Sequence, residues 1–100
     1  MDANRRRFHR VPVHLRFVFA WTGGFALFRA TDVSASGLRL LRVDAQSPLP
    51  GLGDEGPCAF QLAERTFYCD ARVVRVGAEG FAVRLLGLTR AEEDAICAWG

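Results

Sequence analysis

The residues best suited to binding chemistry are four arginines near the start of the chain, Arg5, Arg6, Arg7 and Arg10. Arg6 and Arg10 have the spacing R-x-x-x-R, and Val11-Pro12 then leads into an alternating segment. A guanidinium forms paired hydrogen bonds with phosphate and stacks flat on bases, which an ammonium cannot do. All thirteen basic residues of the chain are arginine. This arginine-rich N-terminal segment, residues 1–10, is called the arm below. It indicates a phosphorylated or nucleotide partner, although such a segment is more often a solvated tail.

A second polar segment, Asp32-Val33-Ser34-Ala35-Ser36-Gly37, follows the second apolar run. Its plain interpretation is a turn, in which Asp32 accepts backbone N–H bonds and Gly37 adopts a left-handed conformation. The same residues also fit a ligand. A carboxylate accepts from guanine's ring N–H and exocyclic amine, a hydroxyl adds a polar contact, and glycine lets a ligand approach the backbone.

Positive charge is concentrated in the arm. Residues 1–10 hold four arginines and one aspartate, a net charge of +3, whereas residues 11–100 hold nine arginines and ten acidic residues, a net charge of −1. A nearly neutral body argues against a nucleic-acid-binding barrel, which needs a basic face with exposed aromatic residues beside arginine.

The apolar stretches argue against membrane insertion and export. The longest of them, such as Phe17–Trp21, are too short to span a bilayer. No signal-peptide core follows the basic start. We therefore expect a cytoplasmic protein.

The remaining reactive side chains indicate neither catalysis nor a metal site. Cys58, Cys69 and Cys97 are odd in number and lack C-x-x-C spacing. Cys58 and Cys69 could fall opposite each other on a hairpin, but we interpret them as small buried thiols. His9 and His14 have no third ligand, and Ser34 has no nearby histidine that could act as its base. We expect no enzymatic activity, no metal and no cofactor.

Short strands are expected around these segments. The alternation over 13–21 predicts a half-buried strand, and Thr22-Gly23-Gly24 predicts a hairpin turn. Val74 and Val76 break the alternation of a later strand, which indicates either a bulge or a strand buried on both faces. The other predicted segments are strands over 25–33, 38–43, 58–62, 67–76 and 81–86, a turn over 32–37 and a loop over 44–57.

A short helix is expected at the end of the chain. Thr89-Arg90-Ala91-Glu92 has the form of a capping box and would open a helix through Trp99, with Ile96 on its buried face. Five or six antiparallel strands usually close to remove their edges. The pattern therefore predicts an all-β fold, a small antiparallel barrel with one C-terminal helix.

The ordered pair of motifs resembles the PilZ family of receptors for cyclic di-guanylate (c-di-GMP). That family carries R-x-x-x-R in a flexible N-terminal segment, followed further along by (D/N)-x-S-x-x-G in a barrel. Here Arg6–Arg10 matches the first motif and Asp32–Gly37 the second, with one complete hairpin strand pair between them. The resemblance extends from Arg5 to the C-terminal helix. The chain departs from it at Ala82 and Leu85, where relatives often have Gly and Phe.

The resemblance implies a six-stranded barrel without catalysis. It implies a flexible basic arm over 1–12 and a single barrel domain with its helix over 13–100. It also implies the ligand-binding residues, which are Arg5, Arg6, Arg10, Asp32, Ser34 and Gly37. The arginines of the motif would hold phosphates and guanine edges, the aspartate and serine would recognise a guanine, and the glycine would leave room for it. An arginine directly before R-x-x-x-R goes with a stacked pair of ligand molecules in such proteins.

We therefore predict a non-catalytic c-di-GMP receptor. No fused enzymatic or receiver segment is visible, so the signal should pass to a separate, unidentified effector protein in trans. We expect neither DNA nor RNA as a partner. Two alternatives stay open: a small nucleic-acid-binding barrel with a basic arm, and an adaptor of the same fold that does not bind the ligand. The intact motifs argue against the second alternative.

Overall fold

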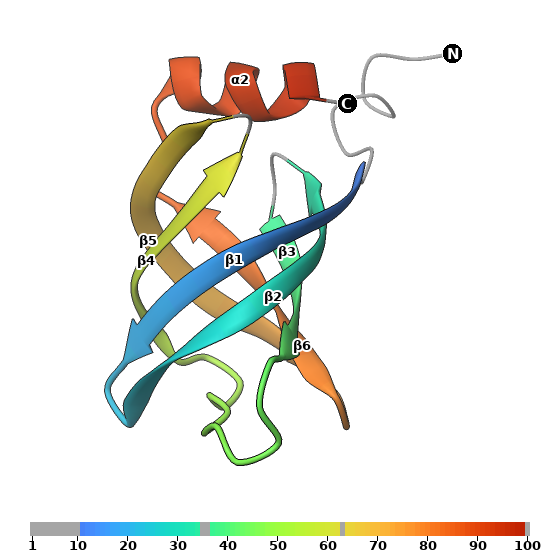
Figure 1. Cartoon of the computed structure of the whole chain (residues 1–100). Helices are drawn as coiled ribbons and strands as arrows, with labels where there is room; N and C mark the ends of the chain where they lie inside the picture. The colour runs from blue at the N-terminus through green and yellow to red at the C-terminus, as the bar shows by residue number, and fades with distance from the viewer. Residues whose placement is uncertain (1–10, 35–36, 63, 100) are drawn as a thin grey trace.

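The computed structural model describes residues 11–34, 37–62 and 64–99. Its elements are β1 (Val11–Trp21), β2 (Gly24–Ser34), β3 (Gly37–Arg42), β4 (Glu55–Leu62), β5 (Arg65–Val76), β6 (Gly80–Leu86) and α2 (Arg90–Trp99). The strands pair antiparallel in the order β1-β2-β3-β6-β5-β4, and β4 pairs with β1 to close the barrel (Figure 1). The prediction of a six-stranded antiparallel barrel with one C-terminal helix is confirmed.

Aromatic side chains fill the barrel. Inward positions alternate with outward ones along each strand, so one face of every strand is buried. Ring contacts run through the interior among Phe17, Phe19, Trp21, Phe28, Phe60, Phe67 and Phe81. Because side chains occupy the interior of a barrel of this size, a ligand site has to lie on its outer face.

Register shifts interrupt three of the strand pairs, and the one between β1 and β2 falls between Pro12 and Leu15. In β2, Ala30 pairs with Leu40 but Asp32 pairs with the next residue back, Arg39, so Thr31 is the extra residue. In β5 the register shifts between Val73 and Arg75. Val74 is therefore bulged and 50% exposed. Of the two explanations for the broken alternation in β5, the bulge is the one that the structure contains.

The segment expected to be a turn over 32–37 is mostly strand. β2 continues to Ser34 and β3 begins at Gly37, so Asp32 lies within a strand. The bulge at Thr31 interrupts the alternation there, and in the sequence this interruption looks like the end of a strand. β1 begins at Val11, two residues before the expected start, and β4 begins at Glu55 inside the expected loop.

Helix α2 covers one end of the barrel, near the end of β2 (Figure 1). The capping box has formed: the Thr89 backbone N–H donates to Glu92 Oε1 at 2.8 Å, and the Glu92 N–H donates to Thr89 Oγ1 at 3.1 Å. Ile96 is 2% exposed, as expected for the buried face. In the described ranges, no helix has the length and apolar content needed to cross a bilayer.

Candidate ligand-binding site

The pairing of β1 with β2 brings the start of β1, which directly follows R-x-x-x-R in the sequence, to the end of β2 that carries the start of D-x-S-x-x-G. Val11 lies opposite Val33, and Pro12 lies opposite Asp32. Arg10 is bonded to Val11 in the chain, so the R-x-x-x-R segment joins the barrel at the residue that lies opposite Val33. The three predicted arm residues, Arg5, Arg6 and Arg10, lie outside the described residues.

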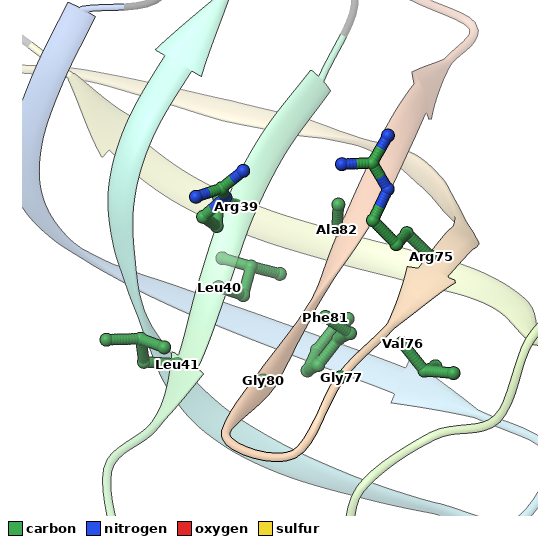
Figure 2. A pocket seen from close by; sticks show the side chains of 9 residues that line it. All are labelled: Arg39, Leu40, Leu41, Arg75, Val76, Gly77, Gly80, Phe81 and Ala82. Atoms are coloured by element: carbon green, nitrogen blue, oxygen red, sulfur yellow. The ribbon is translucent and has the colours of Figure 1, made fainter.

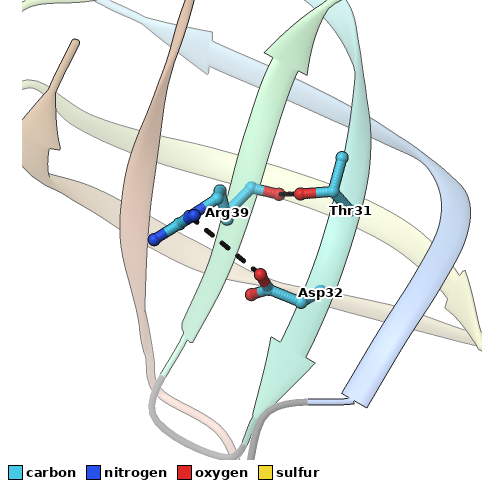
Figure 3. Close-up of polar contacts among 3 residues, drawn as sticks. All are labelled: Thr31, Asp32 and Arg39. Carbon is cyan, nitrogen blue, oxygen red and sulfur yellow. Dashed lines mark hydrogen bonds and ion pairs between the residues drawn. The ribbon is translucent and has the colours of Figure 1, made fainter.

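Asp32 lies on the outer face of β2, beside Arg39 of β3 (Figure 3). Arg39 Nε is 4.0 Å from Asp32 Oδ2, with side chains that are 56% and 20% exposed, respectively. The bulged Thr31 donates its hydroxyl to the Arg39 carbonyl oxygen at 3.5 Å. Both polar contacts are long. A solvent-accessible pair of this length contributes at most about 1 kcal/mol, so loss of the Arg39–Asp32 contact by itself costs little.

Ser34 and Gly37 form the pair that closes the β2–β3 hairpin. The Ser34 side chain lies outside what the structure describes. Gly37 is buried, and its φ is not in the left-handed region. A Cβ at this position would collide with the Val83 carbonyl oxygen of β6. The close approach of β6 therefore accounts for the glycine, whether or not a ligand also uses the space.

Four arginines share the outer face of β3, β6 and β5, and we call them the outer arginine surface: Arg39, Arg72, Arg75 and Arg84. Arg84 pairs with Gly37 on one side and with Arg72 on the other. Like charges directly opposite each other on neighbouring strands are destabilising. Arg72 Nε has Glu55 Oε1 at 3.4 Å, but Arg75 and Arg84 form no ion pair with any other described residue. The surface thus has positive charge available for an anion.

A shallow hollow of about 200 Å³ lies between Arg39 and Arg75, two of the arginines of the outer arginine surface (Figure 2). Ala82 of β6 pairs with Arg39 on one side and Arg75 on the other, and its small side chain leaves space between the two guanidinium groups. Leu41, Val76 and other apolar side chains line the rest of the hollow. Cations at the rim and an apolar floor suit a flat anionic molecule better than a compact ion.

The sequence interpretation identified Asp32 but not the outer arginine surface. The alternation around Val83 indicates that Arg84 points outward, yet only the β3–β6 register shows that it lies beside Gly37. The net charge of −1 over residues 11–100 was also misleading, because a sum over a segment does not report which side chains share a face. Among the described residues, no three histidine, cysteine or acidic side chains are grouped as metal ligands would be.

Comparison with models of known protein families matches residues 4–99 to the PilZ domain. The chain belongs to the PilZ family. Its barrel resembles the PilZ domain of YcgR from Escherichia coli, solved with c-di-GMP, with a TM-score of 0.74 and 16% identity over 92% of this chain and 86% of that one. The PilZ domain of CeSA from a cellulose-synthesizing bacterium has a TM-score of 0.62 and 16% identity, with 88% and 90% covered.

A longer protein is also similar in structure. The inhibitor of motility MotI from Bacillus subtilis has a TM-score of 0.77 and 17% identity over 95% of this chain. The present chain spans about half of the length of MotI, 49%. At these identities the similarity establishes the fold. No curated protein matches the chain by sequence.

Proposed function

We propose that this PilZ protein is a non-catalytic receptor for c-di-GMP that binds its ligand between the R-x-x-x-R segment and the outer face of the β2–β3 hairpin. In this proposal Arg6 and Arg10 bind the phosphates and guanine edges, and Asp32 and Ser34 recognise a guanine. Gly37 lets that base approach the hairpin.

The pairing of Val11 with Val33 is the observation that carries this proposal. Val11 directly follows R-x-x-x-R in the chain and Val33 directly follows Asp32, so this pairing supports a ligand that contacts both motifs. A ligand held by both motifs needs this proximity, because one c-di-GMP molecule is no longer than a few residues of extended chain. The YcgR domain solved with c-di-GMP, which has the same fold, supports the choice of ligand.

The outer arginine surface extends the proposed site. c-di-GMP carries two phosphate charges, and arginine both pairs with phosphate and stacks on bases. Arg84 lies directly beside Gly37, next to where the first ligand would bind. The Arg39–Ala82–Arg75 hollow spans two strand spacings, roughly 10 Å, which is wide enough for a base lying between the two guanidinium groups. We propose that a second, stacked c-di-GMP molecule uses this hollow together with Arg5.

Signalling in this proposal passes to a separate effector protein. Binding would order residues 1–10 across the outer face of the hairpin and so change the surface that an effector contacts, an order–disorder switch. Capture of an effector by the immobilised chain should then depend on c-di-GMP.

The outer arginine surface also favours a second candidate, a nucleic-acid-binding barrel. Four arginines on one face can track a phosphate backbone, which the charge sum of residues 11–100 did not reveal. Base stacking needs exposed aromatic side chains beside those arginines. On β5 the exposed Tyr68 is separated from Arg72 by Asp70, so this face offers no such cluster among the described residues.

Calorimetric titration of the full chain tests the proposal. We expect saturable binding of c-di-GMP, and much weaker binding of GTP and of a single-stranded oligonucleotide. Arg6→Ala and Arg10→Ala should each weaken c-di-GMP binding by about 1.5–3 kcal/mol, the usual contribution of hydrogen bonds to charged groups. Arg16→Ala is the matched control: Arg16 is an exposed arginine of β1 that has no ion pair with a described residue, and it lies away from the hairpin end.

The alternatives predict different results in the same titration. Tighter binding of the oligonucleotide than of c-di-GMP would favour the nucleic-acid-binding barrel. If neither c-di-GMP nor the oligonucleotide binds, the result would favour an adaptor of the same fold that does not bind the ligand. Equal losses in the Arg10 and Arg16 variants would show that the arm contributes only general positive charge.

A further inference from the structure

Two cysteines lie directly opposite each other on the β4–β5 hairpin. Cys58 pairs with Cys69 in the register of the two strands, and the two Sγ atoms are 3.6 Å apart. Both thiols are free. The sequence left this pairing as the less favoured of two interpretations, and neither residue takes part in the proposed ligand site.

The geometry is close to that of a disulfide. Directly opposed residues of antiparallel strands have Cα atoms about 4.5–5.5 Å apart, within the range of about 4.4–6.8 Å that a disulfide spans. The sulfur atoms need to approach from 3.6 Å to about 2.05 Å, which rotation about the Cα–Cβ bonds and a small strand shift can provide.

The two thiols differ in their surroundings. Cys58 is 6% exposed and lies opposite Phe19 of β1, whereas Cys69 is only partly buried. The hydrogen bond between the thiols lowers the pKa of Cys69 and, together with burial, raises the pKa of Cys58. The thiolate is the nucleophile in sulfur chemistry, so the more accessible Cys69 is suited to attack and Cys58 to the second step.

We propose that Cys58 and Cys69 form a site of reversible oxidation by hydroperoxides, which ends in a disulfide between β4 and β5. In the first step the Cys69 thiolate attacks the peroxide, a sulfur–oxygen bond forms as the oxygen–oxygen bond breaks, and the leaving oxygen takes a proton to become water or an alcohol. In the second step the Cys58 sulfur attacks the resulting sulfenic acid, a sulfur–sulfur bond forms, and water leaves. The two thiols lose two electrons, which reduce the peroxide.

Hydrogen peroxide and a Cys97→Ser variant test this site. The variant keeps only the facing pair, so that no third thiol can compete. After mild oxidation we expect monomeric protein that has lost the mass of two hydrogen atoms and both titratable thiols. We also expect one peptide pair joined through Cys58 and Cys69. Dithiothreitol should restore both thiols.

Single-cysteine chains provide the matched controls. In the Cys97→Ser background, Cys58→Ala leaves Cys69 without a partner, so peroxide should convert Cys69 to sulfenic acid and further, without a disulfide within the chain. Cys69→Ala should leave Cys58 reduced under the same conditions, because Cys58 is buried and its pKa is raised.

Three results would overturn the proposal. They are retention of both thiols in the paired chain, disulfides only between chains, and accumulation of sulfinic acid at Cys69 although Cys58 is present. The proposal does not depend on c-di-GMP binding, so its failure and that of the proposed function can be distinguished.

Discussion

Asp32 owes its outward position to one extra residue. Without the bulge at Thr31, alternation from the buried Ala30 would point Asp32 into the apolar interior, where an unpaired carboxylate costs several kcal/mol. With the bulge, Val33 is buried instead, and Asp32 faces Arg39. Asp32, the residue that the sequence motif identifies, therefore faces outward because of a local irregularity of its strand. Bulges are common beside binding sites, where they redirect a side chain in this way.

Replacement of Asp32 tests its role as a base-reading residue. Asp32→Ala should weaken c-di-GMP binding by about 1.5–3 kcal/mol, because the guanine edge loses two acceptors. Asp32→Asn should weaken c-di-GMP binding by a smaller amount, since the amide oxygen still accepts one hydrogen bond. Calorimetry measures both losses, and urea unfolding of each variant separates weakened binding from unfolding. Equal losses in the two variants would leave Asp32 with only a structural role at the bulge.

At the scale of elements, the β2–β3 hairpin depends on how closely β6 packs against it. Gly37 begins β3 at a point where the Val83 carbonyl leaves no room for a side chain. A loss of binding on replacing Gly37 would therefore not by itself identify a ligand contact. The glycine of the D-x-S-x-x-G motif has a structural reason in this chain that its sequence alone does not reveal.

Gly37→Ala should lower the free energy of unfolding by about 1–3 kcal/mol without any ligand, the usual cost of overpacking. Urea denaturation measures this change. Gly51→Ala is the control, because the atom nearest to its added Cβ, Asp54 Oδ2, would be at 3.7 Å, an ordinary contact. Similar stability of the Gly37 variant and the parent would mean that β6 can move away and that the glycine is there for another reason.

Elements with local signals could be predicted from the sequence, and their irregularities only in part. The alternation of β1, the turn at Thr22-Gly23 and the capping box of α2 each depend on residues close together in the chain. The bulge of β5 left a visible break in alternation at Val74. The bulge of β2 also breaks the alternation, but Asp32 and Gly37 are common turn residues, so the sequence predicts a turn over 32–37 at that point.

At the scale of the whole molecule, the outer arginine surface exists only because the barrel closes in a particular order. β3 neighbours β6, and β6 neighbours β5, so Arg39 shares one face with the arginines of the β5–β6 hairpin, which lies far from it in the sequence. A single sequence gives no information on that register. Asp32 and the arm arginines could be proposed because they lie in contiguous motifs, whereas Arg39, Arg75 and Arg84 required the folded chain.

The number of ligand molecules per chain tests whether this surface takes part in binding. We expect two c-di-GMP molecules per chain, and either Arg5→Leu or Arg75→Leu should reduce the calorimetric ratio towards one while keeping the first binding event. Arg16→Leu should leave the ratio unchanged. A parent ratio of one, unaltered by any of these variants, would restrict the site to the two sequence motifs.

Hydrogen exchange with and without c-di-GMP tests whether one ligand is held by both motifs at once. At saturating ligand we predict slower amide exchange in two separate regions, residues 1–10 and the hairpin around Asp32 and Gly37. The far turn at Thr22-Gly23, at the opposite end of β1, should not change. Slower exchange in only one of the two regions, or unchanged exchange in both, would contradict the account.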